Sequence, residues 1–135
     1  MKKLIILALF YLVSCSTVPM TGRKQLVAIP ASQMIALSDE SYALVIKEGQ
    51  LSSNAQYRSM VQKVGENLTK AVEAYMTKYN LEKYIEGYKW HYNVIVSEEL
   101  NAWCMPGGQI AFYEGIMPVC KDENGVAVVM VLTSE

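Results

Sequence analysis

Basic clusters, long apolar runs and histidine are all scarce in this sequence of 135 residues. Its 12 basic and 13 acidic residues nearly cancel, and no lysine- or arginine-rich cluster is present, so we expect no nucleic-acid partner. Internal repeats and low-complexity tracts are also absent. The composition is 52% hydrophobic, which is enough to build the core of a single domain.

The N-terminal apolar stretch, residues 4–13, is too short to span a bilayer, because a transmembrane helix needs roughly 20 apolar residues. Lys2 and Lys3 precede it and a small residue, Ser14, follows it, which is the pattern of a secretory signal. A buried N-terminal helix is the alternative. However, a surface helix needs polar residues for its solvent face, and none interrupts this stretch. Residues 1–14 therefore predict a signal peptide.

The next residue, Cys15, extends this prediction to a lipid anchor. "LVSC" resembles the lipobox of bacterial lipoproteins, in which the cysteine is acylated and becomes the new N-terminus. We expect a lipoprotein anchored to a bacterial membrane through Cys15, with residues 15–30 as a tether and residues 31–135 as the folded part. Ser16 favours the outer membrane, with the protein facing the periplasm. Without residues 1–14 the net charge is −3, which suits a domain held by its lipid.

Cysteine is sparse too, and lipidation of one of the three leaves only Cys104 and Cys120. In an oxidising compartment this pair can form a disulfide, worth ~3 kcal/mol in the chain-entropy model. Two buried free thiols are the alternative, and the sequence leaves both open. A zinc site is not expected from these two cysteines alone, because no further ligand lies nearby at metal-binding spacing.

Hydrophobic periodicity predicts two helices in the first half of the folded part. The first covers residues 31–49, with Gly49 as its stop and an inner face of Met34, Leu37, Leu44 and Val45. The second begins at a Ser53 or Asn54 cap and ends near Tyr79 and Asn80. Its predicted inner face carries Tyr57, Met60, Val61, Val64, Leu68, Ala71, Val72 and Tyr75. Gly65 costs ~1 kcal/mol in a helix and indicates close packing against a neighbour.

The pattern then changes to the period of two that is typical of strands. Residues 89–97 alternate, which predicts a half-buried strand, and a turn at residues 97–100 leads to a hairpin around Pro106, Gly107 and Gly108. The glycines allow a positive φ where a side chain would clash. Asp122 begins a final helix with Val126, Val129 and Met130 inside. Two helices, a small sheet with a Pro-Gly-Gly hairpin and the start of a C-terminal helix predict an α+β fold.

No catalytic constellation is evident among the residues present. His91, the only histidine, lies on the alternating strand without a partner ligand, so a structural role is expected. Glu98 and Glu99 are adjacent and would face opposite sides of an extended chain, which is typical of a solvated turn. No Gly-x-Ser-x-Gly nucleophile elbow occurs.

Four segments carry a more specific signal: TGRKQL at residues 21–26, YRSMVQKVGENL at 57–68, NAWCMPGGQIAFYEGIM at 101–117 and DENGVAVVM at 122–130. They occur in this order in a family of zinc metalloendopeptidases, which the sequence resembles from about Pro19 to Met130. This family includes the CaaX prenyl proteases, the mitochondrial Oma-type protease and periplasmic lipoprotein relatives. The most discriminating part is Asn-Ala followed, three residues later, by Pro-Gly-Gly.

The resemblance implies part of a gluzincin-type protease domain, in which the strand bearing Asn-Ala lies along the active-site cleft. An extended peptide substrate can add to such an edge through main-chain hydrogen bonds. The implied substrate-binding edge strand is Asn101, Ala102, Trp103, Cys104 and Met105, followed by the turn Pro106, Gly107 and Gly108. From residue types alone, an ordinary hairpin is the alternative.

In the family, the next helix carries H-E-x-x-H, with two zinc-binding histidines and a glutamate general base. Where the family continues from VVM into Gly-His-Glu, this sequence reads Val131, Leu132, Thr133 and Ser134 before its last residue, Glu135. We therefore expect zinc in the complete family member, and no bound metal and no catalytic residue in this chain.

Two functional hypotheses follow. The first is the N-terminal portion of an exported, lipid-anchored zinc metalloendopeptidase of the protein-quality-control type, inactive by itself, whose ending reflects a frameshift, a gene fragment or a boundary error. The second is a finished lipoprotein that keeps a peptide-binding edge without hydrolysis, a pseudoprotease. In both, the expected partners are protein or peptide substrates and a membrane.

Overall fold

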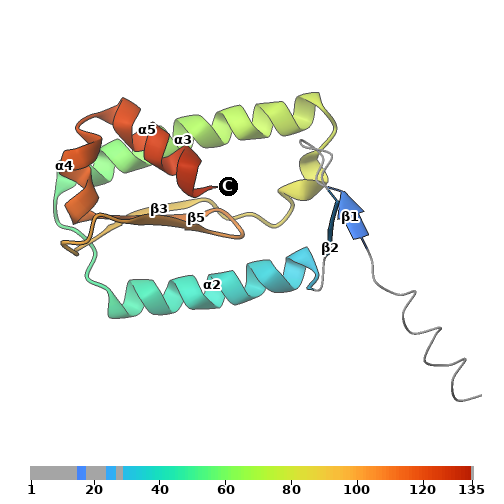
Figure 1. Ribbon diagram of the computed structural model, residues 1–135, viewed down its shortest axis with the longest axis horizontal. Helices are drawn as coiled ribbons and strands as arrows, with labels where there is room; N and C mark the ends of the chain where they lie inside the picture. Colours follow the sequence, from blue (N-terminus) through green and yellow to red (C-terminus); the bar gives the residue numbers. More distant parts are fainter. Residues whose placement is uncertain (1–14, 18–23, 27–28, 135) are drawn as a thin grey trace, which may run out of the picture. The chain divides into compact units, whose positions relative to one another are not determined.

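The computed structural model describes residues 15–17, 24–26 and 29–134 (Figure 1). The predicted signal peptide, residues 1–14, and most of the predicted tether lie outside these residues. The chain divides into two compact units, residues 1–33 and 34–135. In the first unit, β1 (Cys15–Thr17) pairs with β2 (Lys24–Leu26) in an antiparallel ladder. Among the described residues, no helix is both long enough and apolar enough to cross a membrane.

The two predicted helices are present, as α2 (Ala31–Glu48) and α3 (Ala55–Lys78). The Asn54 side chain caps α3 by accepting hydrogen bonds from the backbone N–H groups of Gln56 and Tyr57, at 3.1 Å each. This helix ends where Asn80 adopts a left-handed conformation with φ of 55°. Two short 3₁₀ turns that the periodicity did not predict are η2 (Glu82–Tyr84) and η3 (Glu114–Ile116).

The sheet has three strands: β3 (His91–Ile95), β4 (Ala102–Met105) and β5 (Gln109–Tyr113). Their order is β3-β5-β4, with β3 parallel to β5 and β4 antiparallel to it. The predicted hairpin is confirmed, and Gly107 and Gly108 have φ of 102° and 91°, which a side chain would strain. Because β3 pairs in parallel with β5, the last of the three strands along the chain lies at the centre of this sheet.

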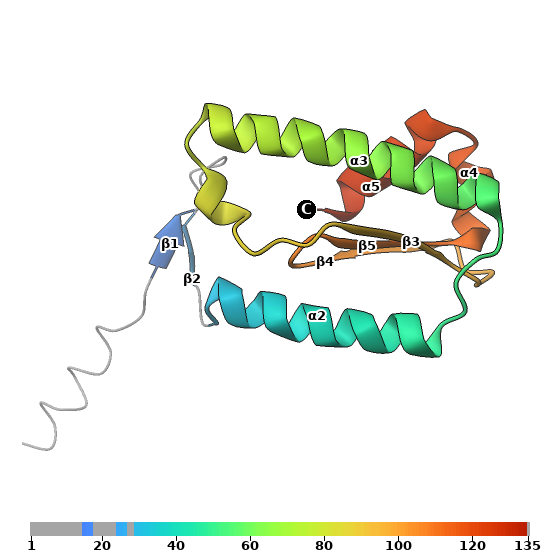
Figure 2. The ribbon, with the colours of Figure 1, turned by 180° about the vertical axis from the view of Figure 1, so that it is seen from behind.

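Helices cover both faces of this sheet. Helix α2 lies along one face, and α3 lies along the other with α5 (Glu123–Thr133), as Figure 1 and its reverse view in Figure 2 show. The short helix α4 (Met117–Cys120) leads from η3 into α5, whose first turn is capped by Asp122. The fold is therefore α+β, as predicted, with a small mixed sheet between helices.

The main core fills the space between the sheet, α3 and α5. Its fully buried members include Val61, Val94, Phe112, Val126 and Met130. Gly65 on α3 lies against the Tyr92 ring, and a Cβ at this position would collide with that ring. The close packing predicted from the glycine is thus confirmed.

Three predictions about buried faces are wrong in part. On α2, Met34, Leu37 and Leu44 are exposed, and Ser38 and Tyr42 are buried instead. Strand β3 is covered on both faces at its C-terminal end, where Val94 and Ile95 are 1% and 5% exposed. The errors on α2 and β3 have one cause: α2 packs on the second sheet face through Ser38 and Tyr42, which covers that face and leaves apolar residues of α2 in solvent. On α3, the predicted inner face extends too far, because Ala71 and Tyr75 are exposed.

Candidate functional site

The candidate site is the outer edge of β4. Within the described part of the chain, β4 pairs with β5 alone and is an edge strand of the sheet. The Tyr113 N–H donates to the Asn101 carbonyl at 3.0 Å, which makes these two residues a hydrogen-bonded pair. Because successive residues of an antiparallel strand alternate between the two sides, Ala102 and Cys104 direct their N–H and C=O groups away from β5. These are the groups that a visiting strand would meet.

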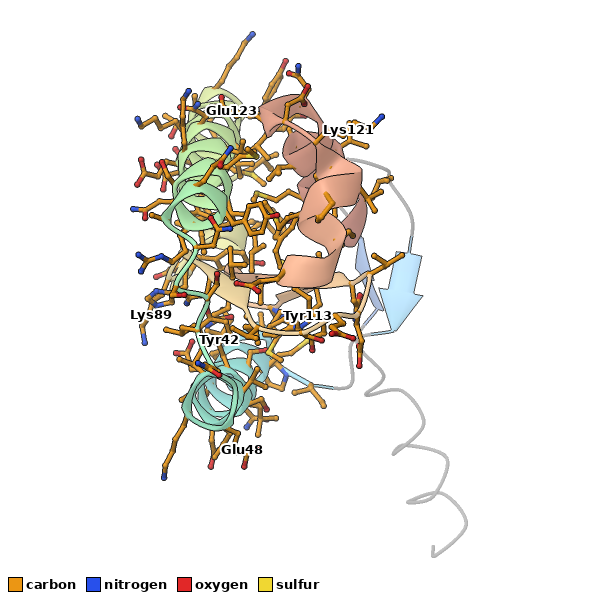
Figure 3. All side chains as sticks on the ribbon, turned by 90° about the vertical axis from the view of Figure 1, so that its left-hand side faces the viewer. Tyr42, Glu48, Lys89, Tyr113, Lys121 and Glu123 are labelled. Atoms are coloured by element: carbon orange, nitrogen blue, oxygen red, sulfur yellow. The ribbon has the colours of Figure 1, made fainter. Side chains whose placement is uncertain are left out.

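The side chains of β4 alternate between the two covered faces of the sheet. Ala102 and Cys104 pack with the main core beneath α3 and α5. Trp103 is half-buried on the opposite face, where its ring meets Tyr42 of α2 edge-on at 5.9 Å. Figure 3 shows Tyr42 between α2 and the sheet, with Glu48 directed away from it. Asn101 is exposed at the start of the strand. The main chain of β4 is thus supported on both faces of the sheet, and no strand among the described residues pairs with its outer edge.

The hairpin turn is fixed by backbone contacts from the start of β3. Lys89 N–H donates to the Gly107 carbonyl at 2.7 Å, and His91 N–H donates to the Gly108 carbonyl at 3.1 Å. The Trp90 ring lies against Gly108, where a Cβ would clash with it. Pro106 is exposed, and both glycines are buried. These contacts hold the turn against the start of β3 and so help to fix the register of β4 in the sheet.

A polar network that the sequence analysis missed joins α2 to this hairpin. Gln109 is 1% exposed, and its side-chain N–H donates to Asp39 of α2. The other carboxylate oxygen of Asp39 forms an ion pair with Lys89 at 2.9 Å. The Gln109 Oε1 atom is buried without a hydrogen-bond partner. The available signal was the polar Gln109 at the start of the apolar segment QIAFY, since a buried amide needs a partner.

Cys104 and Cys120 are free thiols in the structure. This is the state of the second alternative, and the disulfide between them stays a prediction for an oxidising compartment. Cys104 is half-buried on β4 and Cys120 is buried in α4. Burial raises the pKa of both thiols, and a hydrogen bond with Ser134 opposes this in part for Cys104. Neither thiol has the lowered pKa of an activated nucleophile.

His91 stacks on the Tyr42 ring at 5.9 Å with an interplanar angle of 18°. It borders an open groove of about 500 Å³ between α3 and β3, whose other lining residues include Glu66, Thr69 and Glu73. Glu98 and Glu99 are exposed in the connection before β4, as predicted, and Glu98 borders a hollow of about 450 Å³ beside Glu114. Glu114 in turn accepts a hydrogen bond from the buried Ser52 hydroxyl.

A zinc site does not fit the donor set of the described residues. No group of three or more His, Cys, Asp or Glu side chains among them is placed to hold a metal ion. The final helix carries Val131, Leu132 and Thr133, none of which offers an imidazole or carboxylate ligand. We therefore assign no chemical step of this chain to a metal.

These elements define the class of structure as an α+β domain in which a supported hairpin presents a free strand edge. Comparison with known proteins identifies the family. Residues 59–131, more than half of the chain, match the model of Peptidase family M48, so the chain belongs to that family.

Two curated relatives are both named mitochondrial metalloendopeptidase OMA1. The protein from Schizosaccharomyces pombe is 45% identical over 42 residues, which are 31% of this chain and 12% of the relative. The protein from Saccharomyces cerevisiae is 21% identical over 126 residues, which are 91% of this chain and 36% of the relative. This chain therefore spans only about a third of the length of the Saccharomyces cerevisiae protein. The resemblance to Oma-type metalloendopeptidases stated from the motifs is confirmed.

Proposed function

We propose that this chain supplies the substrate-binding edge of an exported, lipid-anchored zinc metalloendopeptidase, with proteins or peptides as substrates. The observation that carries the proposal is that β4, which bears the Asn101–Ala102 motif, is an edge strand held in place on both faces. Membership of a peptidase family supports the substrate class.

The proposed recognition is sequence-tolerant, because it uses the main chain of the substrate. An extended peptide beside β4 would accept hydrogen bonds from the outward N–H groups of Ala102 and Cys104 and donate to their carbonyl groups. Trp103 and Met105 lie on the α2 face and would limit which substrate side chains fit there. Folded proteins offer few free extended segments, so this edge favours unfolded or locally opened substrates.

Hydrolysis is assigned to the complete family member. Zinc there would supply a Lewis acid and a bound water of lowered pKa. The residues of this chain bind and align the substrate, and we expect the 135-residue chain by itself to bind peptide without cleaving it. One equivalent of tightly bound zinc together with chelator-sensitive peptide cleavage by the purified chain would overturn that expectation.

A proline scan of β4 tests the proposed binding edge. Cys104→Pro removes one outward N–H and leaves the ladder to β5 intact, so we expect peptide binding to weaken by about tenfold, the value of one well-formed hydrogen bond. Cys104→Ala is the matched control, since it changes the side chain and keeps the N–H. Saturable binding of a fluorescent unfolded peptide gives the dissociation constant. Equal binding by a folded Cys104→Pro variant and by Cys104→Ala would contradict the proposed edge.

Lipid attachment needs a separate test. We expect metabolic labelling with a palmitate analogue to mark the full chain in a bacterial host, and Cys15→Ser to abolish the label. Cys104→Ser and Cys120→Ser serve as controls and should keep it. Labelling that persists in Cys15→Ser would contradict the anchor.

A further inference from the structure

An exposed group of tyrosines and lysines lies at one end of the second unit. We call Tyr75, Lys78 and Tyr79 of α3, with Lys83 and Tyr84 of η2, the tyrosine–lysine surface. The three tyrosines are 39%, 52% and 41% exposed, in chain order. The ring centroids of Tyr75 and Tyr79 are 4.6 Å apart. The ammonium groups of Lys78 and Lys83 lie over neighbouring tyrosine rings, at 5.5 and 5.0 Å from their centroids.

The chemistry of this surface matches the boundary layer of a bilayer. Tyrosine has an apolar ring and a polar tip, and it is enriched at the level of lipid headgroups. Lysine can lay its apolar stem along such rings and extend its ammonium group to a phosphate. Residues 75–90 contain three lysines and two glutamates, and one of the lysines, Lys89, forms an ion pair with Asp39, so the segment carries no excess of positive charge. The proposed contact therefore depends on the exposed tyrosine rings and on the two lysine ammonium groups that lie over them.

The path of the chain also favours a membrane as the partner of this surface. The second unit begins at Met34, near the start of α2, and Ile35 lies close to Gly87 in the loop after η2. Figures 1 and 2 both show the start of α2 at the same end of the second unit as η2 and the end of α3. Lipid attachment at Cys15, which belongs to the proposed function, would thus tether the second unit from the end that carries the tyrosine–lysine surface.

We propose that the tyrosine–lysine surface contacts the headgroup layer of a membrane and orients the domain on it. The Pro106–Gly108 turn lies at this end too, because its carbonyl groups bond to Lys89 and His91 just after the segment. The strands run along the same direction as α2 and α3 (Figure 2). In this orientation the edge of β4 extends away from the bilayer, with the turn nearest the lipid.

Depth-dependent fluorescence quenching tests this contact in the full chain. We would place a tryptophan in the surface with Tyr79→Trp, and a second one at the other end of β4 with Leu100→Trp, which replaces a side chain that is 70% exposed. Each full-length variant is reconstituted in vesicles of phosphatidylcholine and phosphatidylglycerol that contain bromolipids. The emission of the unmodified chain, which has two tryptophans, is subtracted. We expect the added emission of Tyr79→Trp to be quenched about twofold or more relative to Leu100→Trp, because aromatic side chains at the interface lie near the acyl chains.

The outcomes separate this proposal from the lipid anchor. Tyr84→Trp is a second probe should Tyr79→Trp lose its cooperative thermal transition, and Lys78→Glu combined with Lys83→Glu should remove the excess quenching. Equal quenching at residues 79, 84 and 100 in the vesicle-bound chain would contradict the proposed membrane contact, even if Cys15 carried a lipid. Stronger quenching at residues 79 and 84 than at residue 100 would support the surface. It would do so even if Cys15→Ser bound vesicles as well as the unmodified chain, a result that would contradict the lipid anchor.

Discussion

At the scale of single residues, burial decides the chemistry of the two thiols. Cys104 packs beneath α5 and Cys120 is buried in α4, and both are free. Desolvation disfavours the thiolate and raises the pKa of each thiol above its ordinary value. The more reactive form is therefore depleted at neutral pH in the native protein.

We expect slow alkylation of the native thiols. Between neutral pH and the ordinary thiol pKa of about 8.5, Cys104 should react with iodoacetamide several-fold more slowly than in the unfolded chain, and Cys120 more slowly still. Since the native pKa is raised, stability is lost as the pH rises from the unfolded thiol pKa through the native one. Mass spectrometry of tryptic peptides measures the rates, and Cys104→Ser isolates Cys120. A native chain that reacts only after reduction would show a disulfide and contradict this account.

A second residue-scale prediction concerns Asp39. Asp39→Ala leaves the buried amide of Gln109 without its acceptor, which should cost about 1–3 kcal/mol of unfolding free energy. The exposed ion pair with Lys89 adds little to this. Denaturant unfolding measures the change, and Glu40→Ala, an exposed neighbour on the same helix, should change stability by about 0.5 kcal/mol or less. Equal effects of the two substitutions would rule out the network as a stabilising contact.

At the scale of elements, the sequence predicted more about local structure than about which faces are covered. The Asn54 cap, the end of α3 and the Pro-Gly-Gly hairpin each depend on local chemistry, and each was predicted. The covering of the second sheet face by α2 was not, because Ser38 and Tyr42 are buried there through partners distant in sequence, such as Asn93. The Gln109–Asp39 contact was missed for the same reason. The order of the strands in the sheet could not be predicted either, because hydrophobic periodicity does not show that β3 pairs in parallel with β5.

The contact between α3 and β3 gives an element-scale prediction. Gly65→Ala gains helix propensity of about 1 kcal/mol, but its Cβ would collide with the Tyr92 ring, so we expect a net loss of about 1–3 kcal/mol. Combining it with Tyr92→Leu should recover part of that loss relative to the two single changes. Ala71→Gly, at an exposed position of the same helix, should cost about 1 kcal/mol. A Gly65→Ala variant as stable as the unmodified chain would show that the packing is looser than described.

At the scale of the whole molecule, a supported edge strand, a proposed lipid anchor and a tyrosine-rich end combine into one arrangement. Membership of a metallopeptidase family fixes the class of protein. In the proposed function, substrate pairs with β4, which lies at the edge of the sheet. The motif Asn101–Ala102 was singled out from the sequence through a family resemblance, because residue types alone could not distinguish a substrate edge from an ordinary hairpin.

Hydrogen exchange at β4 tests the central claim most directly. Saturating the purified chain with an unfolded peptide should slow hydrogen exchange at the outward amides of Ala102 and Cys104. The exchange rate of the Trp103 amide, which faces β5, should stay nearly unchanged. This alternation is the pattern expected of strand addition, because only the outward amides of β4 would bond to the peptide. Saturable peptide binding with unaltered exchange at Ala102 and Cys104 would contradict the account.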